Sequence, residues 1–564
     1  MVWKINERNK LSEKIVIIGG VAAGTSAAAK IRRSSEAAEI VIFEKGRYVS
    51  YGTCGLPYYV SGTIENLDKL IINTPRSFLE RFNILVKTQC QVLSIDSVGK
   101  TIQVKDLKED KIFEESWDKL IIATGSMPVK LNLEGADSEN VFVLKTIDDG
   151  LRMKSFLDEL EGDNLGAVII GGGFIGLELL EAFKKKGMKV TILEKTAQLL
   201  PMFDSQIIGY LHNYLKSQGI EIITLKEAGR LLAKNNRVEW VETSNGQRIK
   251  ADIVFFGVGT RPQSELAKET GIDTSENSAI SVDKYMQTSI PGIYAAGDCC
   301  NCHHEITNEK RPYNLASIAN RQGRVAGYNA CGGSDIFDSS CVSSIIKVLD
   351  LAIAKTGISL REAIEAGIDA GVIELHHLSH SGYYPGAEMI HMMLIYDRTD
   401  GHILGFQAIG KKGVDKKADV VSTAIRGRMR VQDLANLDLC YQPEYGSAKD
   451  AVNILGMIGE NIGKGEINFI ESEQLEEMIK KDIDFILLDV RTEEEYRKGH
   501  IRGSINISVN KLRDNMNQLE KEKPIVVYCK VGYRAYLAYR MLANRGFKDV
   551  KALNGSITSW LRKI

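Results

Sequence analysis

The sequence predicts a multidomain α/β protein, and three patterns along the chain carry this prediction. Two segments in the first half each show a strand, a glycine turn, a helix and a second strand. From about Val342 the chain changes to longer apolar strands followed by a helix from about Lys416, which predicts a separate α+β domain. After a glycine-containing connector, "MIGENIGKGEIN", short strands alternate with helices again from about Glu466 to Ile564, which predicts a final α/β domain.

The composition is that of an ordinary globular protein. The chain has 564 residues, of which 44% are hydrophobic and 26% charged, enough for roughly three or four domains with full cores. The formal net charge is −1, so no basic field indicates nucleic acid as a partner.

The number of cysteines and the composition of the N-terminal segment indicate in which cellular compartment the protein resides. Nine cysteines are too sparse for a disulfide scaffold and odd in number, so we expect reduced thiols. The opening "MVWKINERNKLSEK" has no apolar core of a signal peptide, and no run of about 20 apolar residues occurs. A cytoplasmic protein without a membrane span is expected.

The first strand–helix unit begins with "KIVIIG", Lys14 to Gly19. The following "GGVAAG" keeps Gly19 and Gly24 of G-x-G-x-x-G, with Val21 at the middle position. Such a turn lets a pyrophosphate approach the N-terminus of a helix, where unpaired N–H groups favour anions. Glu44 ends the next strand and is predicted to accept hydrogen bonds from an adenosine ribose. The alternative is a tight turn without a ligand.

The second unit is "AVIIGGGFIGLELLEAFKKKGMKVTILEK", with Gly171, Gly173 and Gly176 all present. Glu194 ends the following strand, where a carboxylate suits a free 2′-hydroxyl. NADH is therefore favoured over NADPH, although the neighbouring lysine weakens the preference. Glu178 is expected either to face the nicotinamide or to be an ordinary exposed helix residue.

Two further segments, "LIIATGSMP" and "TSIPGIYAAGDC", resemble the fingerprints of the two-dinucleotide-binding-domain flavoprotein disulfide reductases. The resemblance implies Rossmann-like FAD and NAD domains, with FAD in the first site and NADH or NADPH in the second. The residues expected to bind FAD are Gly19, Gly20, Gly24, Glu44, Lys45, Ala123, Thr124, Gly125, Gly297 and Asp298.

A lone cysteine stands in "YVSYGTCGLPYYVSG". Reductases such as glutathione reductase carry C-x-x-x-x-C here, but the residue five after Cys54 is Tyr59. Cys54 is therefore expected to work through a mixed disulfide with a small thiol or through a sulfenic acid. A helix N-terminus beside it is expected to lower the pKa of the thiol. The alternative is a buried core cysteine.

The single-cysteine branch contains coenzyme A–disulfide reductases, NADH oxidases and NADH peroxidases. The peroxidases carry a histidine in the first glycine loop, where this chain has Ala22. The segment around Cys54 resembles the coenzyme A–disulfide reductases most, although Thr53 replaces their usual asparagine. That resemblance implies coenzyme A contacts at Arg33 and Ser50. Arg33 is alternatively a solvated helix arginine.

"HSGYYPGA" and "LDLCYQPEYGSAKD" resemble the dimerisation domain of the same family. There, two tyrosines of one subunit reach the cysteine of the other, which implies a homodimer. By position these are Tyr383 and Tyr441, and Tyr384 is an alternative to Tyr383. A phenol can donate a proton to a leaving thiolate. The other interpretation is aromatic packing at an interface.

"LLDVRTEEEYRKGHIRGSINI" and "VVYCKVGYRAYLAYRML" resemble a rhodanese domain. The resemblance implies that Cys529 to Arg534 form the catalytic loop, with Cys529 as the nucleophile. Consecutive N–H groups there can surround an anionic persulfide, and Arg534 is expected to order the loop or bind an anion. The alternative is an inactive rhodanese that keeps its cysteine.

The segment "CCNCHHEI" contains Cys299, Cys300, Cys302, His303 and His304. The spacing C-x-C-H suggests a metal site, but no second half-site is apparent. We expect a reduced loop and no bound metal.

The predicted domains are an FAD-binding domain (14–125 and 260–335), an inserted NAD-binding domain (126–259), a dimerisation domain (340–455) and a rhodanese domain (466–564). Together they predict an FAD-dependent NAD(P)H oxidoreductase that reduces persulfide, polysulfide or coenzyme A disulfide through Cys54. The rhodanese would handle sulfane sulfur. The alternatives are an NADH oxidase cycling a sulfenic acid, and a sulfur carrier or redox sensor with little turnover.

Overall fold

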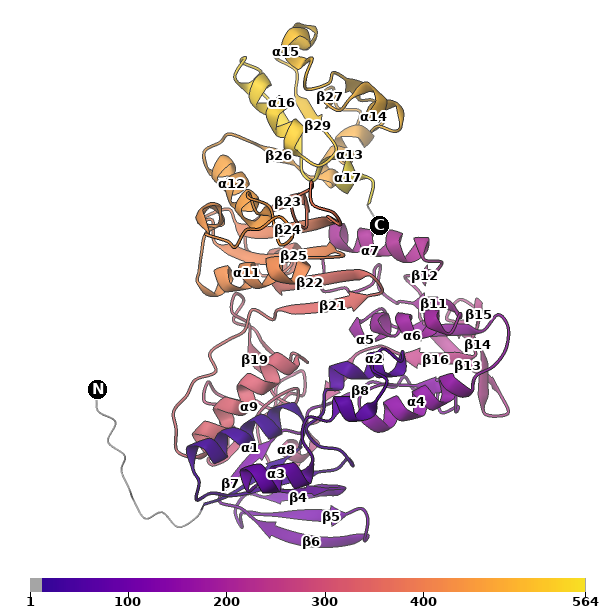
Figure 1. The fold of residues 1–564 in the computed structure, drawn as a ribbon, viewed down its shortest axis with the longest axis vertical. Coiled ribbons are helices and arrows are strands. Elements are labelled where there is room, and N and C mark those ends of the chain that lie inside the picture. Colours follow the sequence, from indigo (N-terminus) through magenta and orange to yellow (C-terminus); the bar gives the residue numbers. More distant parts are fainter. Residues whose placement is uncertain (1–12, 563–564) are drawn as a thin grey trace, which may run out of the picture. The chain divides into compact units, whose positions relative to one another are not determined.

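The computed structural model describes residues 13–562 and confirms the α/β class (Figure 1). The chain divides into two compact units. One runs up to Lys195 and continues with Lys226–Val342; the other comprises Thr196–Leu225 and the chain from Ser343 onward. Among the described residues, no helix combines the length and apolar character needed to cross a membrane.

The first sheet of the first unit is parallel, and its β-branched strands are buried in a core that they share with helices and with Val92, Ile95, Ile102 and Val104 of a small antiparallel sheet. Its strand order is β18-β7-β1-β2-β3. The strands are β1 (Lys14–Ile18), β2 (Glu39–Glu44), β3 (Leu85–Thr88), β7 (Lys119–Ile122) and β18 (Ile293–Ala295). Helices α1 (Ala22–Ser34) and α9 (Ala316–Ala330) lie side by side, since a Cβ at Gly323 would lie 2.2 Å from the Ala23 carbonyl oxygen.

The second sheet repeats this architecture, as the repeated glycine motif predicts. Strands β11 (Lys189–Leu193), β10 (Gly166–Ile170), β16 (Ile253–Phe256) and β9 (Val141–Phe142) lie parallel in that order. Its helices are α4 (Ile147–Glu159), α5 (Phe174–Glu178) and α6 (Leu180–Lys185). The two passages between the sheets pair as antiparallel strands β8 (Ser126–Pro128) and β17 (Thr260–Pro262).

Smaller elements complete the first unit. They are the sheets β4 (Cys90–Asp96), β5 (Thr101–Asp106) and β6 (Lys111–Ser116), and β13 (Ala228–Lys234), β14 (Arg237–Thr243) and β15 (Arg248–Lys250), the pair β19 (Cys302–His303) and β20 (Lys310–Arg311), and helices α2 (Leu56–Val60), α3 (Pro75–Phe82) and α8 (Glu265–Glu269).

The second unit begins with an antiparallel sheet of order β21-β22-β25-β24-β23. Its elements are β21 (Ser344–Val348), β22 (Leu351–Gly357), β23 (Ala370–Leu378), β24 (Met389–Asp397), β25 (Ile403–Gly410), and helices α10 (Leu360–Glu365), α11 (Val414–Arg426) and α12 (Ala451–Gly463), with α7 (Ser205–Ser217) and β12 (Glu221–Ile223) from the earlier segment. The expected strands and the helix near Lys416 are confirmed.

The expected connector "MIGENIGKGEIN" is mostly helix, so that interpretation was wrong. Its first part is the C-terminal half of α12. A Cβ at Gly456, within the same helix, would lie 2.1 Å from the Ala435 backbone nitrogen. Glycine in α12 is therefore required by close packing, and it does not interrupt the helix.

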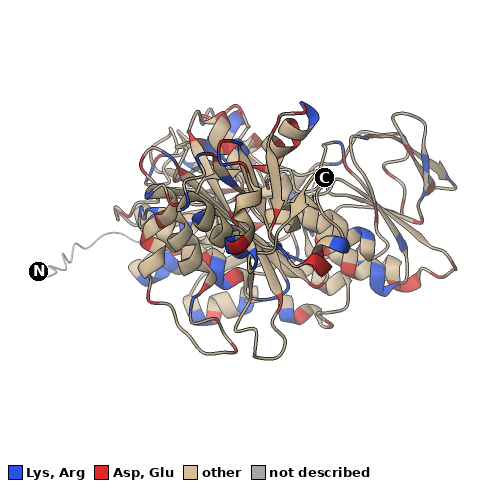
Figure 2. Ribbon diagram, turned by 90° about the horizontal axis from the view of Figure 1, so that it is seen from above, with Lys and Arg blue, Asp and Glu red and all other residues tan. Residues whose placement is uncertain are grey.

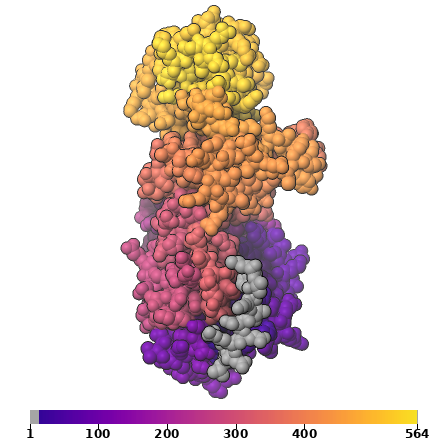
Figure 3. All heavy atoms as spheres, turned by 90° about the vertical axis from the view of Figure 1, so that its left-hand side faces the viewer, coloured from indigo at the N-terminus to yellow at the C-terminus, as the bar shows by residue number. Residues whose placement is uncertain are grey.

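The last domain is a parallel sheet of order β26-β30-β29-β27-β28. Its strands are β26 (Phe469–Ile470), β27 (Ile486–Asp489), β28 (Ile505–Asn506), β29 (Ile525–Tyr528) and β30 (Val550–Leu553), and its helices are α13 (Ser472–Lys480), α14 (Glu493–Arg497), α15 (Leu512–Asn515), α16 (Tyr533–Ala543) and α17 (Ser556–Trp560). Figure 2 shows acidic and basic residues mixed along the same helices, as the balanced composition predicts. Figure 3 shows the residues of the last domain, in yellow, as one rounded body.

Candidate active sites

The first glycine loop has no room for side chains. Gly19 has φ +104°, and a Cβ there would lie 2.2 Å from the Ala123 carbonyl oxygen. A Cβ at Gly24 would lie 1.9 Å from the Gly19 carbonyl oxygen. Thr124 donates to the Gln263 carbonyl at 2.5 Å, next to Gly125 at φ +71°. The loop and the strand end at Ala123 thus form a cradle of bare backbone at the start of α1, which fits a pyrophosphate.

Glu44 holds this loop from the end of β2. Its carboxylate accepts the Gly20 and Gly46 N–H groups, each at 2.7 Å. Burial raises the pKa of Glu44, and these two bonds oppose the rise. Each oxygen keeps a lone pair for a ribose hydroxyl. Lys45 is exposed beside it.

Asp298 follows β18, behind Gly297 at φ +87°. Its carboxylate accepts Ser126 Oγ–H at 2.9 Å and forms an ion pair with Lys145 Nζ at 3.0 Å. Lys145 could not be selected from its local pattern, because its partner lies far along the chain. The arrangement places a fixed carboxylate, with spare acceptor capacity, where sugar-alcohol hydroxyls can be bound.

The second loop repeats the geometry of the first. Gly171 has φ +100°, and a Cβ there would lie 2.6 Å from the Gly257 carbonyl oxygen. A Cβ at Gly176 would lie 2.8 Å from the Ile169 side chain. Glu194 is buried and accepts the Gly172 N–H at 2.7 Å. Both predicted nucleotide loops are therefore built in the same way.

Cys54 is exposed and lies in a 3-10 turn, Thr53–Gly55, directly before α2. Glu178, on α5 after Gly173, accepts the Tyr58 hydroxyl at 3.4 Å. Although the residue is exposed at the surface, neighbouring atoms partly desolvate the Cys54 sulfur, which raises the pKa of the thiol, and the Glu178 carboxylate raises it further. The expected lowering was wrong, because a five-residue helix is a weak dipole and a carboxylate lies nearby. Tyr58, one turn after Cys54, could have been found from its i, i+4 spacing.

Replacing Glu178 with glutamine should lower the pKa of Cys54. Burial raises the pKa of Glu178 to about 7, so above neutral pH its charge opposes thiolate formation. The rate of iodoacetamide alkylation at Cys54, followed by peptide mass spectrometry against pH, should shift to lower pH in E178Q. Glu181→Gln is the matched control, since its carboxylate is paired with Lys185. An unshifted profile in E178Q would contradict this assignment.

Arg33 and Ser50, the residues expected to contact coenzyme A, line one surface groove of about 360 Å³. Asn73, Asn320 and Arg324 line it too. Arg324 was not predicted, because only the packing of α9 on α1 brings it to the groove. Two arginines and several neutral polar groups can bind phosphates and amides.

Tyr383 and Tyr441 lie together in the second unit. Their hydroxyls form a hydrogen bond of 2.9 Å, and the side chains are 75% and 50% exposed. This bond lowers the pKa of Tyr383 and raises that of Tyr441. The ring of Tyr384 instead packs edge-on against His380. The geometry favours the Tyr383–Tyr441 pair, available at the surface, as the candidate proton donors.

Cys529 is buried at the junction of β29 and α16. Its Sγ accepts the Gly532 N–H at 3.1 Å, and Gly532 has φ +108°. The Cys529 N–H donates to Ser556 Oγ at 3.2 Å. A sulfur anion at this position has a backbone N–H directed at it, as a nucleophile loop requires.

Arg534 forms a two-point ion pair with Glu495, at 2.7 and 2.8 Å. The pairing holds the pKa of Glu495 at about 2. Of the two expected roles, ordering the loop is the one that these contacts support. The buried pair of Asp489 and Arg491, at 2.6 Å, likewise braces the domain.

The cysteines of "CCNCHHEI" lie among backbone groups. Cys299 donates to the Ile122 and Ala296 carbonyls, and Cys300 to the Gly297 carbonyl. Nothing in these contacts converges on a common centre. The absence of a metal here stays a prediction.

Comparison with known proteins identifies the family. The family described as pyridine nucleotide-disulphide oxidoreductase matches residues 13–323, its dimerisation domain matches 343–451, and a rhodanese-like domain matches 471–563. The chain belongs to this oxidoreductase family. It is a pyridine nucleotide–disulphide oxidoreductase that carries a dimerisation domain and a C-terminal rhodanese domain.

Several relatives of this oxidoreductase are named. The solved structure of reduced CoADR-RHD from Bacillus anthracis is 34% identical, with a TM-score of 0.94 and 98% of each chain covered. A NAD-dependent persulfide reductase from A. fulgidus is 35% identical, with a TM-score of 0.90, covering 97% of this chain and all of that one. A coenzyme A disulfide reductase of Staphylococcus haemolyticus is 31% identical over 78% of this chain and 98% of its own. An NADH oxidase of Methanocaldococcus jannaschii is 34% identical over 78% and 97%.

Proposed function

We propose that this oxidoreductase uses FAD and NADH to reduce coenzyme A persulfide or coenzyme A disulfide through Cys54, and that its rhodanese domain handles the sulfane sulfur. The observation that carries the proposal is the isolation of Cys54. It is exposed, none of the nine cysteines forms a disulfide in the described structure, and buried Tyr59 stands where a second redox cysteine would be. The partner sulfur must therefore come from a bound thiol.

The residues that would hold the cofactors fit them. The bare-backbone loop at Gly19 and Gly24, with the carboxylates of Glu44 and Asp298, suits FAD, and the second loop suits the nicotinamide dinucleotide. When bound, FAD would supply a path for two electrons from the nicotinamide to the sulfur at Cys54. Glu194, fixed by the loop, would accept a ribose 2′-hydroxyl and repel a 2′-phosphate, so we infer a preference for NADH.

Coenzyme A would lie in the groove beside α1. Arg33 and Arg324 would bind its phosphates, and Ser50, which also lines the groove, precedes Cys54 by four residues in the chain. The flexible pantetheine arm would bring the thiol to Cys54.

Replacing Arg33 or Arg324 with glutamine should raise the KM for coenzyme A disulfide about tenfold while kcat changes little, because a charge-assisted bond to phosphate is lost. Steady-state NADH oxidation measures both constants. Arg76→Gln is the control, since that exposed arginine pairs with Glu80 outside the groove. Unchanged KM values in both groove variants would place coenzyme A elsewhere.

The proposed reduction at Cys54 takes two steps, each balanced in atoms and electrons. The Cys54 thiolate attacks the inner sulfur of R–S–SH, which breaks the S–S bond, releases HS⁻ and leaves Cys54–S–S–R. Two electrons then break this disulfide to Cys54 thiolate and R–S⁻, which takes a proton. We infer a homodimer in which Tyr383 and Tyr441 of one subunit supply that proton to the site of the other.

The rhodanese domain would supply the substrate. A persulfide on Cys529, stabilised by the Gly532 N–H, can pass its outer sulfur to the thiolate of coenzyme A. This exchange regenerates the Cys529 thiolate and forms coenzyme A persulfide, which the reductase site consumes.

Anaerobic NADH oxidation with coenzyme A persulfide tests the proposal. One sulfide and one coenzyme A should appear for each NADH oxidised. Intact mass under denaturing, non-reducing conditions should show a coenzyme A adduct that maps to Cys54. Turnover without sulfide release would reject persulfide as the substrate, and a missing adduct would reject the mixed disulfide.

An NADH oxidase is the second candidate, favoured by the relative of that name from Methanocaldococcus jannaschii. Cys54 would then cycle through a sulfenic acid. NADH-dependent oxygen consumption in the absence of any thiol, equal in rate to the persulfide reaction, would favour this candidate.

A further inference from the structure

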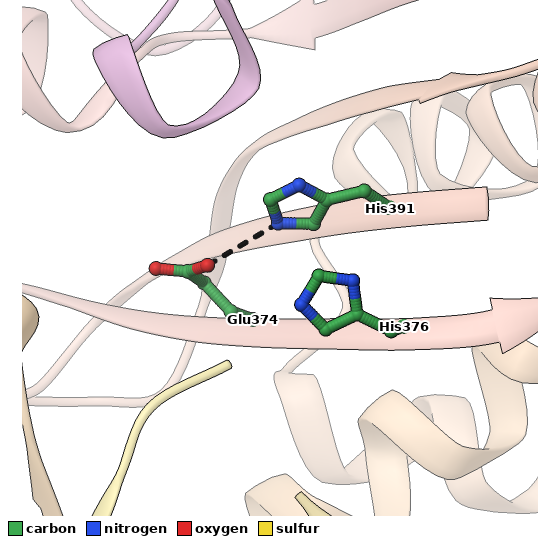
Figure 4. A group of neighbouring side chains, drawn as sticks. All are labelled: Glu374, His376 and His391. Carbon is green, nitrogen blue, oxygen red and sulfur yellow. Dashed lines mark hydrogen bonds and ion pairs between the residues drawn. The ribbon is translucent and has the colours of Figure 1, made fainter. Parts of the chain in front are cut away.

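A buried polar cluster lies on the sheet of the dimerisation domain (Figure 4). Glu374 and His376 come from β23, and His391 is the direct cross-strand neighbour of His376 on β24. Their exposed fractions are 7%, 4% and 1%. Three titratable groups on one buried face need a reason, because burying a charged group is costly.

Hydroxyl groups from other elements bind this cluster. The Tyr210 hydroxyl, on α7, lies 3.0 Å from His376 Nδ1. Ser559 Oγ, on α17, lies 3.0 Å from His376 Nε2 and donates to Glu374 Oε2 at 2.5 Å. His391 Nε2 lies 3.2 Å from Glu374 Oε2, as Figure 4 shows.

These contacts fix one direction for every proton when Glu374 is ionised. Ser559 donates to Glu374, so its oxygen accepts from His376 Nε2–H, and His376 Nδ1 accepts from Tyr210. His391 donates from Nε2, and its Nδ1 is a buried atom without a hydrogen-bond partner in the described structure. The cluster is a continuous chain of hydrogen bonds with neutral histidines.

The same contacts argue against a metal ion. The three ligand atoms lie within 4.8 Å of one another, but the imidazole rings of His376 and His391 stack, with centroids 4.4 Å apart and planes at 27°. A metal lies in the plane of each imidazole that binds it, and stacked rings do not share such a point. Both nitrogens of His376 are already engaged.

The chain of hydrogen bonds reaches the rhodanese nucleophile through one short segment, Asn554–Ser559. At one end, Asn554 Oδ1 accepts the Glu374 N–H at 3.0 Å. In the middle, Ser556 Oγ accepts the Cys529 N–H, and the Ile557 N–H donates to the Cys529 carbonyl at 3.2 Å. The segment therefore holds the Cys529 backbone on one side and the buried cluster on the other.

We infer that Glu374 is a positioning residue for Cys529, and that gain or loss of one proton at Glu374 changes sulfur transfer by the rhodanese domain. A proton added to Glu374 Oε2 and directed at Ser559 Oγ reverses that bond, while the bond from His391 Nε2–H can stay as it was. Ser559 then turns to donate to His376 Nε2, and His376 carries its proton on Nδ1 and donates to Tyr210. One proton thus reverses the hydrogen bonds from Glu374 through Ser559 and His376 to Tyr210, and alters the hold on Asn554–Ser559.

Burial, more than the surrounding charges, places this change near neutral pH. Burial raises the pKa of Glu374 to about 7. The negative charges of Glu473, in the first turn of α13, and of Asp204, directly before α7, raise it as well. Burial lowers the pKa of His391 to about 3 and that of His376 well below its usual value. Arg562 lies over the Tyr210 ring, 3.6 Å from its centroid. Glu471 is bound by Asn554 Nδ2 at 3.0 Å, and burial raises its pKa to about 7 as well.

This inference rests on the proposed sulfurtransferase activity. The test uses the full chain, with thiosulfate as sulfur donor and cyanide as acceptor, and records the rate against pH. The wild type should show an inflection near the Glu374 transition, with a change of about fivefold, at the low end of coupling between sites. Glu374→Gln should remove it, and Glu374→Asp should keep it. Glu388→Gln, at a partly exposed carboxylate before β24 that pairs with Lys411, should match the wild type. Glu471→Gln removes the second group that titrates near neutral pH and shows how much of the inflection belongs to it.

Ser559→Ala keeps every charge and cuts the chain of hydrogen bonds, so its profile should also become flat. An inflection that persists in S559A and in folded E374Q overturns the inference. A wild type without any sulfur transfer overturns the proposed rhodanese function instead, so the two failures are distinguishable.

Discussion

Replacing Cys54 with serine should reduce persulfide and coenzyme A disulfide turnover by at least about 10³-fold, since a serine hydroxyl forms no mixed disulfide. Anaerobic NADH oxidation with each substrate measures this loss. NADH should still reduce the bound flavin in C54S, because the second glycine loop and Glu194 are untouched. The coenzyme A adduct should disappear from the intact mass.

Cys440→Ser is the matched control, because Cys440 is the other exposed cysteine of the described structure. It should retain full turnover and the adduct. If C54S keeps a tenth or so of the wild-type rate, reduction does not pass through Cys54. An adduct that moves to Cys440 would lead to the same conclusion.

Replacing Cys529 with serine should abolish thiosulfate:cyanide sulfur transfer, by about 10³-fold or more, because the persulfide has no sulfur to form on. Reduction of added coenzyme A persulfide should be unchanged, since that substrate bypasses the rhodanese step. NADH oxidation driven by thiosulfate with catalytic coenzyme A should stop, because it needs both cysteines.

Cys341→Ser, at a buried cysteine outside the rhodanese domain, controls for the general effect of the substitution. Thiosulfate-driven NADH oxidation that survives in C529S would show that sulfur reaches coenzyme A by another route. The sulfur carrier or sensor alternative predicts something different again: a stable persulfide on Cys529 and slow turnover with every donor.

Local patterns were enough to predict the two glycine loops. The strand, the glycine loop and the acidic residue at the end of the next strand lie within one short unit, so Gly19, Glu44, Gly171 and Glu194 were predicted as nucleotide-site residues from spacing, and the structure shows each glutamate bound to its loop. Their geometry is set by contacts that the unit makes with itself. The resemblance to a known family added Tyr383 and Tyr441 as candidates, which no periodicity indicates; the hydrogen bond between their hydroxyls was not predicted.

Residues whose role depends on distant parts of the chain were missed. Lys145 pairs with Asp298 across 153 residues, and Arg324 reaches the groove only because α9 packs on α1. The predicted direction of the Cys54 pKa shift was wrong because desolvation, the larger cause, and the carboxylate of Glu178 on α5 both depend on how the chain folds. The glycines of α12 led to the wrong prediction of a connector for a different reason. Glycine is common where a helix is interrupted, but it also occurs where a helix packs closely, as Gly456 does.

The segment Thr196–Leu225 belongs to the second compact unit, and this has a consequence for folding during synthesis on the ribosome. This segment belongs with the chain from Ser343 onward, and α7 buries Ile207, Ile208 and Leu211 there. The part of the chain that forms the second nucleotide-binding sheet therefore leaves the ribosome together with an apolar helix whose packing partners have not yet been synthesised. Vectorial folding must leave α7 exposed until its packing partners β24 and β25 follow. A chain that stops at Val342 should accordingly aggregate, although both of its glycine loops are complete.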